Sequence, residues 1–527
     1  MPHRRCSLWL VSALIVPLAA GCDDSAGHDP ADDLPADAAA ADRGSDVSPA
    51  DAAAADSGRD GWIDGDGPDA SGDPPAADAG TSSSDEDGGV DAGPTLDCGA
   101  RTECAGRCVD LATDGAHCGA CEAACDASEV CLEGACTAGP VEAWTVDFDF
   151  GGGESALVED FAVDAEGNLY VVGTGRAAPY RTLPGSRAGG FVERWDTDGT
   201  LGFRQVMPHL EATGASPLGV AAGEAGRYYV IGSTVGAYPF DATHASAPED
   251  RGYVAAYDAH HAIEWLITTD LVASRQLERH GDRLYAVMRG QEANAFPIEL
   301  EGVRFTTDDG IGFDWFTIAL TTAGAVRWGH GSDTDDRANG LAVLADHVVR
   351  AGYHTIATGG GLSSHRYQLD ALDHDGTTLD GYDDFGVPGG SAVAEGGGVV
   401  YVAANGPDGW VLQRYIDRTL DWERALGEAV HVSDVVVDAR GRAYLGGTLS
   451  GAHSFDGEHL GEEHDGWVAA FDAEGGLRWV DIVDNPAGSL WVVMKEVEVS
   501  LASGLVYYRY RVTSRDGERV VALRQPE

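Results

Sequence analysis

The residues best suited to chemistry are cysteines crowded into one short segment. Cys104 and Cys108, and likewise Cys118 and Cys121, have spacings that zinc ligands often show. An even number of cysteines in a short exported segment is instead typical of a module held by disulfides, because such a module is too small to form a hydrophobic core. We expect up to four disulfides, with no pairing singled out, among the eight cysteines of residues 98–136: Cys98, Cys104, Cys108, Cys118, Cys121, Cys125, Cys131 and Cys136.

Export of the chain is indicated by its first residues. Residues 1–22 read MPHRRCSLWLVSALIVPLAAGC, with the basic start, apolar run and small final residues of a secretory signal peptide. The segment from Leu18 to Cys22 resembles the lipobox of bacterial lipoproteins, which are cut before the cysteine and acylated on it. The resemblance implies removal of residues 1–21 and acylation of Cys22, for example with palmitate. The protein would then be anchored to a membrane of the bacterial cell envelope, at the outer membrane or cell surface. Ordinary cleavage that leaves Cys22 as a free thiol is the alternative.

Other candidate metal ligands are few. Asp333, Asp335 and Asp336 stand close together and could supply oxygen ligands to calcium. No regular series of ligands follows them, so the pattern favours a solvated acidic loop. His260 and His261 lie in a predicted turn without a carboxylate or cysteine beside them, which favours plain exposure over metal binding. Because no G-x-S-x-G, H-E-x-x-H or sialidase-type Asp-box motif is present, we expect no catalytic residue and no cofactor.

The composition is strongly acidic, with a formal net charge of −53 over 527 residues. This excludes a protein that binds nucleic acid by neutralising phosphates, since such a surface must be basic. The segment from Asp23 to Asp97 consists almost entirely of Asp, Ala, Gly, Pro and Ser and carries a net −19. It cannot bury enough apolar surface to offset its chain entropy, so we expect residues 22–97 to form a disordered linker behind the anchor.

The elements that must support any binding site are repeated. A strand, a Gly turn and a second strand recur seven times, beginning with DAEGNLYVVGT at Asp164 and ending with LASGLVYYRYR at Leu501. A second hairpin follows each copy and often ends on tryptophan, as at Trp265, Trp328 and Trp422. A repeat that contains four strands is typical of the blades of a propeller. Two copies depart from the pattern, with Phe203 and Asp380 in place of the tryptophan.

The ends of the repeat array indicate how a ring would close. The seventh copy lacks a fourth strand, whereas residues 139–155 resemble a fourth strand with Trp144 at the tryptophan position. We expect Glu142–Phe150 to pair with Arg519–Gln525. The sequence thus predicts an all-β chain with four parts: a signal peptide (1–21), the lipidated linker (22–97), a cysteine module (98–138) and a seven-bladed β-propeller (139–527) closed by its N-terminal strand. An open solenoid is the alternative architecture.

Three resemblances support this division. The segment from Ala443 to Trp479 is similar to bacterial SBBP-type β-propeller repeats, with Gly-Thr, Phe-Asp and Asp-Gly-Trp-Val-Ala landmarks. Its end, AAFDAEGGLRW, also resembles the tryptophan motif of pyrroloquinoline-quinone propellers, which implies a blade-packing device. Residues 104–136 resemble the stigma-specific cysteine-rich family, which implies an extracellular module. The resemblances imply a fold and assign no chemistry.

The features together predict a non-catalytic protein that binds or displays a protein or glycan partner at the cell surface, and acts as a monomer. Its acidic propeller favours a neutral or cationic partner. Plausible contact residues on long loops, which could equally be core residues, are Tyr180, Tyr238, Phe240, Phe296 and Tyr353. A propeller enzyme, either a glycan lyase or a hydrolase, is the alternative, and carboxylates on the axis would favour it. A scaffold for envelope assembly is a third hypothesis.

Overall fold

The computed structural model describes the chain between Thr102 and Pro526. Within that range the residues not described are 105–106, 110, 112–116, 122, 126–128, 133, 149–155, 176–188, 209–212, 248–249, 291–297, 306–314, 332–336, 358–362, 380–390, 407, 456–457, 486–490, 501 and 514–517. The predicted signal peptide, Cys22, the linker and Cys98 lie outside the described residues, as do Tyr180, Phe296 and the calcium candidates Asp333, Asp335 and Asp336.

Seven four-stranded antiparallel sheets form the blades of the fold. In each blade the strands are given from the first to the fourth. They are β6 (Ala156–Val163), β7 (Leu169–Gly175), β8 (Gly189–Trp195) and β9 (Leu201–Pro208) in blade 1; β10 (Gly214–Ala222), β11 (Tyr228–Val235), β12 (Gly252–Tyr257) and β13 (Ile263–Thr269) in blade 2; β14 (Val272–His280), β15 (Arg283–Arg289), β18 (Trp315–Thr321) and β19 (Val326–Gly331) in blade 3; β20 (Arg337–Val343), β21 (His347–Ala357), β22 (Ser363–Asp373) and β23 (Thr378–Leu379) in blade 4; β24 (Ser391–Gly396), β25 (Val399–Gly406), β26 (Gly409–Ile416) and β27 (Thr419–Gly427) in blade 5; β28 (Val430–Val437), β29 (Ala443–Leu449), β32 (Gly466–Phe471) and β33 (Leu477–Val483) in blade 6; and β34 (Val492–Ser500), β35 (Leu505–Val512), β36 (Glu518–Arg524) and β5 (Val141–Asp147) in blade 7.

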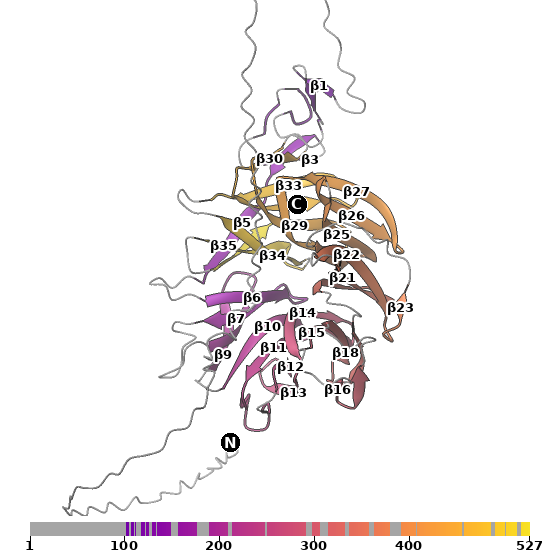
Figure 1. Cartoon of the computed structure of the whole chain (residues 1–527). Coiled ribbons are helices and arrows are strands. Elements are labelled where there is room, and N and C mark those ends of the chain that lie inside the picture. The colour runs from indigo at the N-terminus through magenta and orange to yellow at the C-terminus, as the bar shows by residue number, and fades with distance from the viewer. Residues whose placement is uncertain are drawn as a thin grey trace, which may run out of the picture. The chain divides into compact units, whose positions relative to one another are not determined.

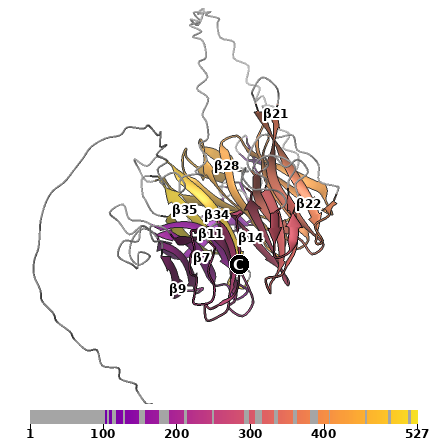
Figure 2. The ribbon, with the colours of Figure 1, turned by 60° about the horizontal axis from the view of Figure 1, so that its bottom comes forward.

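The blades close into a ring (Figure 1 and Figure 2). The first strand of each blade contacts the first strand of the next, and β34 of blade 7 contacts β6 of blade 1. The predicted seven-bladed propeller is therefore confirmed, and the open solenoid is wrong. The described residues contain no helix. In particular, this part of the chain has no helix with the length and apolar character needed to cross a membrane.

The hydrophobic core consists of seven clusters, one between each pair of consecutive blades. Because a blade packs on both of its faces, a strand such as β12 is buried along its whole length, and its sequence shows no polar alternation. The largest fully buried side chains include Trp467, Tyr170 and Tyr228. Stability therefore depends on blade-to-blade contacts more than on any single blade.

The ring is closed by the strand that the sequence predicts. Strand β5 pairs antiparallel with β36, and Trp144 lies opposite Ala522. Arg519 binds Asp147 through two hydrogen bonds, with N–O distances of 2.5 and 3.1 Å. Strand β5 thus supplies the fourth strand of blade 7, and β36 is left without an open edge.

The tryptophans at the fourth strands join neighbouring blades. The indole Nε1 of Trp144 donates a hydrogen bond to the carbonyl of Thr197 in blade 1, at 3.0 Å. Its ring lies on Gly199, which has a positive φ of 81° and where an added Cβ would stand 2.8 Å from Trp144 Cγ. The same arrangement joins Trp265 to Thr322 and Gly324, Trp328 to His374 and Gly376, and Trp422 to Ala473 and Gly475. The predicted packing role of these tryptophans is thus observed.

Phe203, the first departure from the pattern, is matched by a change in the next blade. His261 occupies the turn position that is glycine in blades 1, 3, 4 and 6, with a φ of 66°. Its imidazole stacks on Phe203 with the ring centroids 3.6 Å apart. A smaller ring on one side is therefore compensated by a larger residue on the other. Asp380, the second departure, belongs to blade 4 and lies outside the described residues. The corresponding turn of the next blade, blade 5, contains Asp417 and Arg418, both with positive φ.

Small hairpins are inserted in two of the predicted long loops. They are formed by β16 (Ile298–Leu300) with β17 (Val303–Phe305) in blade 3, and by β30 (His453–Phe455) with β31 (Glu458–Gly461) in blade 6. In blade 2 the corresponding loop folds on itself. Tyr238 is 6% exposed there, and Phe240 packs edge-on against both Tyr238 and Tyr253.

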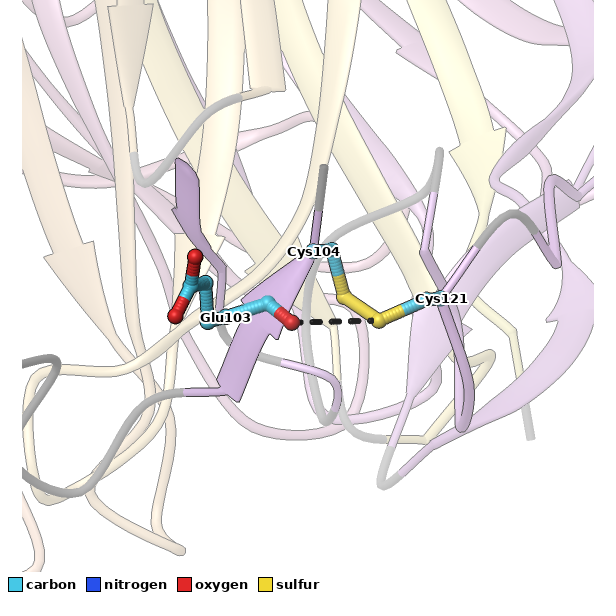
Figure 3. Close-up of a disulfide and its surroundings, with 3 residues drawn as sticks. All are labelled: Glu103, Cys104 and Cys121. Atoms are coloured by element: carbon cyan, nitrogen blue, oxygen red, sulfur yellow. Dashed lines mark hydrogen bonds between the residues drawn. A yellow bond between two sulfur atoms is a disulfide. The ribbon is translucent and has the colours of Figure 1, made fainter. Parts of the chain in front are cut away.

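The cysteine module contains two short hairpins, β1 (Thr102–Cys104) with β2 (Arg107–Val109), and β3 (Glu129–Leu132) with β4 (Ala135–Ala138). Disulfides join Cys104 to Cys121 and Cys125 to Cys136, and Cys118 is also disulfide-bonded. Figure 3 shows the first bond, with Cys121 Sγ 3.6 Å from the carbonyl oxygen of Glu103. The side chains of Cys108 and Cys131 lie outside the described residues.

The compensation at the junction of blades 1 and 2 predicts strong coupling between two substitutions. Phe203→Trp alone forces the indole against His261 and should lower the free energy of unfolding by about 1–3 kcal/mol. His261→Gly alone leaves a gap beside Phe203, although it relieves about 1 kcal/mol of positive-φ strain. The double variant recreates the junction seen elsewhere and should unfold within about 1 kcal/mol of the parent. Denaturant unfolding of the four proteins tests this, and strictly additive effects would contradict it.

Candidate functional site

A cavity of about 530 Å³ lies on the propeller axis and is lined by the first strands of all seven blades. Its walls carry many charged side chains, which sequence analysis did not single out. The acidic residues are Glu159, Asp160, Glu278, Glu395, Asp434, Glu496 and Glu498, and the basic ones are Arg275, Arg279, Lys495 and Arg509. The axis is therefore polar and predominantly acidic, which makes it the candidate site.

β-bulges aim these side chains at the axis. The first strands β6, β28 and β34 each shift register where they reach Asp160, Asp434 and Glu496. Strands β10 and β20 shift at the same level, where they carry Gly219 and Gly340. A bulge places an extra residue opposite one partner and frees backbone groups from the ladder. The side chain at the bulge then turns toward the cavity.

The bulge carboxylates bind the backbone of the next blade. Asp434 of blade 6 accepts a hydrogen bond from the amide of Val497 in blade 7 at 3.0 Å. Glu496 of blade 7 accepts one from Phe161 in blade 1 at 3.4 Å, and Asp160 of blade 1 accepts one from Val220 in blade 2 at 2.7 Å. We call these three bonds the bulge clasps.

The series of bulge clasps ends at blade 2. Its equivalent position is Gly219, which has no side chain that could accept a hydrogen bond from blade 3. A Cβ at Gly219 would stand only 2.2 Å from the carbonyl oxygen of Arg275 in blade 3. This close approach requires glycine. It also lets Arg275 reach across blade 2 to Glu159 of blade 1, with an N–O distance of 2.6 Å.

Arg509 anchors the clasps from the second strand of blade 7. Its guanidinium is almost fully buried and donates to the carbonyl oxygens of Val158 and Glu159 in blade 1. It also forms ion pairs with Glu496 at 2.9 Å and with Glu518 at 3.1 Å. Removing this arginine would leave buried carboxylates unpaired across the junction that closes the ring.

A second level of the cavity holds two carboxylates opposite small residues. Glu278 of β14 and Glu498 of β34 occupy equivalent positions, since they lie opposite Tyr285 and Tyr507 of the second strands. The other five blades place Ala162, Ala221, Ala342, Ala394 and Val436 at this level. The two glutamates therefore extend into an opening that small side chains leave free.

Burial makes several of these carboxyls hard to ionise. Burial and the neighbouring Glu496 carboxylate raise the pKa of Asp434 to about 8 and that of Glu278 to about 7. Burial likewise raises the pKa of Asp160 and Glu498 well above the usual values. Glu278 is accessible to water and yet surrounded by protein, because it lies inside the cavity. The neighbouring Glu496 carboxylate adds to the rise in the pKa of Asp160.

The sequence-predicted site residues take other positions. His260 is 90% exposed, and His261 packs on Phe203. Tyr238 belongs to the core between blades 1 and 2 and Phe240 packs against it, which is the core alternative that the sequence left open. Tyr353 is in β21, but its side chain lies outside the described residues.

Zinc at the cysteine module is not supported by the sulfur atoms that are described. The sulfurs of Cys118, Cys125 and Cys136 lie within 4.8 Å of one another. All three are disulfide-bonded and so are not thiolates that could bind a metal. Among the described residues no other group of three acidic, histidine or cysteine side chains comes as close together, the axial carboxylates included.

Comparison with known proteins supports no family assignment. No family model and no curated protein matches the sequence. Raptor of Chaetomium thermophilum is similar in structure with a TM-score of 0.45 and 8% identity, over 74% of this chain and 30% of its own. The Dos1 propeller has a TM-score of 0.39 and 10% identity over 70% and 78% of the two chains. The exotype rhamnogalacturonan lyase YesX has a TM-score of 0.32 and 12% identity over 72% and 75%. The propeller assignment rests on the sheet topology described above.

The raised carboxyl pKa values predict that acid stabilises the fold. Between about pH 4 and pH 8 the folded protein holds protons that the unfolded chain releases. This stability is fully present below the usual carboxyl pKa and is lost as the pH rises through the folded values. Thermal unfolding should therefore occur at a higher temperature at pH 5.5 than at pH 8.5.

Asp434→Asn isolates one contribution, because the amide oxygen can still accept the clasp bond while the charge is gone. The drop in Tm from pH 5.5 to pH 8.5 should shrink by about 2 °C. Asp484→Asn, on an exposed residue, is the control and should leave the drop unchanged. An equal drop in parent and Asp434→Asn would contradict the assignment.

Proposed function

We propose that the chain is an exported, lipid-anchored protein of the bacterial cell envelope whose propeller binds part of a protein or glycan partner in the axial cavity without transforming it. The observation that carries the proposal is the cavity itself. Its volume of about 530 Å³ lies within the range of about 300–1,000 Å³ common for ligand pockets. Its excess of carboxyls suits a neutral or cationic group.

Binding fits the axial carboxyls better than catalysis does. Asp160, Asp434 and Glu496 already accept backbone hydrogen bonds that hold blades together. Asp160 and Glu496 also interact with each other, since Glu496 raises the pKa of Asp160. Moving protons or charge on these groups would loosen the ring.

A glycan lyase or hydrolase is the second candidate. It is favoured by Glu278 and Glu498, which interact electrostatically, have raised pKa values and take no part in the clasps. A carboxyl that titrates near neutral pH is suited to general acid or base work. Turnover of a glycan panel by the parent and its loss in Glu278→Gln would replace the binding proposal with this one.

The anchor is supported by the sequence of residues 1–22 and by the acidic linker that follows. A tether of this kind places the propeller away from the membrane surface, where it can meet a partner. Acidic linker and acidic propeller repel each other, which keeps the linker extended.

A substitution that fills the cavity tests the binding proposal. Ala394→Trp places an indole beside Glu278 and Glu498 and should weaken capture of envelope glycans and peptides at least tenfold in biolayer interferometry. Its Tm is measured alongside to show that the variant folds, because Ala394 lines the cavity and also packs against the core between blades 5 and 6. Ala165→Trp, on an exposed turn of blade 1, is the matched control and should bind like the parent. Equal binding by Ala394→Trp would place the site elsewhere.

The anchor is tested separately. Cys22→Ala should move the protein from the membrane fraction to the soluble fraction, because no acyl chain can be attached. Mass spectrometry of the mature N-terminal peptide should show acylated Cys22 in the parent. An unmodified Cys22 with unchanged membrane association would contradict the lipoprotein assignment.

A further inference from the structure

The axial cavity contains the only lysine of the chain. Lys495 precedes the bulge residue Glu496 in β34 and lines the cavity together with Arg275. It is exposed to the cavity, and no ion pair joins it to a carboxylate among the described residues. Its nearest charged neighbours include the cations Arg509, Arg275 and Arg511, with Glu518 as the opposing charge. Lys495 is therefore a positive group in a crowded, partly positive environment.

Two carboxyl groups that form no ion pair among the described residues lie at another level of the cavity. Glu498 is three residues after Lys495 and, like its counterpart Glu278, lines the cavity. Three residues of strand correspond to about 10 Å. Among the described residues neither glutamate forms an ion pair, although Glu498 accepts a hydrogen bond from the amide of Val499. The cavity thus has an ammonium group at one level and a pair of carboxyls about 10 Å away.

Burial disfavours the charged forms of Lys495, Glu278 and Glu498, and a ligand with complementary charges would stabilise those forms. A carboxylate of the ligand would pair with Lys495, and Arg275 stands beside it. An ammonium group of the ligand would fit between Glu278 and Glu498, where the other blades offer only alanine and valine. Both ends of one molecule would then be neutralised.

We propose that the axial cavity binds a zwitterion whose carboxylate and ammonium groups lie about 10 Å apart, such as a short extended peptide with free ends. This inference rests on the proposed binding function and specifies its ligand. An extended chain advances about 3.3–3.6 Å per residue, so three residues match the separation of the charges. The clasp carboxylates Asp160 and Asp434 lie between the two levels, where amide groups of such a peptide can donate hydrogen bonds to their remaining oxygen lone pairs.

The single lysine provides a direct readout. Reductive methylation of the full chain with ¹³C-formaldehyde labels the Lys495 side chain and keeps its charge, and its resonance is assigned by its loss in Lys495→Arg. Titration with tri-alanine should shift this resonance in a saturable manner. N-acetylated tri-alanine, which lacks the ammonium group, and tri-alanine amide, which lacks the carboxylate, should each bind at least tenfold more weakly by calorimetry.

Variants separate the two ends of the site. Lys495→Met should weaken tri-alanine at least tenfold and leave the affinity for its amide unchanged, whereas Lys495→Arg should retain binding. Glu278→Gln should weaken tri-alanine while leaving the acetylated form unchanged. Glu166→Gln, on an exposed turn, is the control.

Two results would overturn the inference. Equal affinities for tri-alanine and both capped forms would show that the charges are not recognised. No shift of the Lys495 resonance with up to about 10 mM tri-alanine would show that such peptides do not enter. If a glycan still binds the parent and fails to bind Ala394→Trp, the proposed function stands and only the zwitterion is wrong. If nothing binds the parent, both fail.

Discussion

The inner strands of a propeller must be held together without forming a common sheet. In this protein the bulges free backbone amides on the first strands, and buried amides need acceptors. Asp434, Glu496 and Asp160 supply them, so that blades 6, 7, 1 and 2 are joined in sequence. Arg509 then forms ion pairs with Glu496 and with Glu518 and so balances their charge. The electrostatic character of the cavity follows from the requirement to hold the ring closed at its center.

Blade number and ring closure could be predicted because they depend on local signals. The turn glycines and terminal tryptophans recur at regular intervals, and Trp144 marks the strand displaced to the beginning of the array. The axial cavity could not be predicted in the same way. Glu278 and Glu498 are 220 residues apart in the sequence, and only the closed ring places both side chains in the same cavity. A signal was nevertheless present, because charged pairs interrupt the apolar strands ALVEDFAV and VVMKEVEVS.

The loop aromatics of blade 2 could not be assigned from the sequence, because an aromatic residue in a long loop can serve either in recognition or in the core. Tyr238 and Phe240 look like recognition residues in an exposed loop, but the loop folds back and buries them against Tyr253. Side chains of this size gain more from packing than from exposure unless a partner covers them. Phe203 shows a different relation between sequence and packing. It replaces the usual tryptophan of the repeat with a smaller ring, and His261 of the next blade stacks on it in compensation.

The pairing of β5 with β36 gives the chain a defined order of assembly. Asp147 and Arg519, which bind each other across this pair of strands, are 372 residues apart in the sequence. Because the chain is synthesised from its amino terminus, β5 must wait with its edge open until the last strands are made. The segment of residues 23–97 that precedes it carries a net charge of −19, and like charges repel one another. Once β5 and β36 have paired, a pull on that segment acts along β5 and loads all hydrogen bonds of this strand pair at the same time. The strand that completes the ring therefore also resists mechanical opening of the ring.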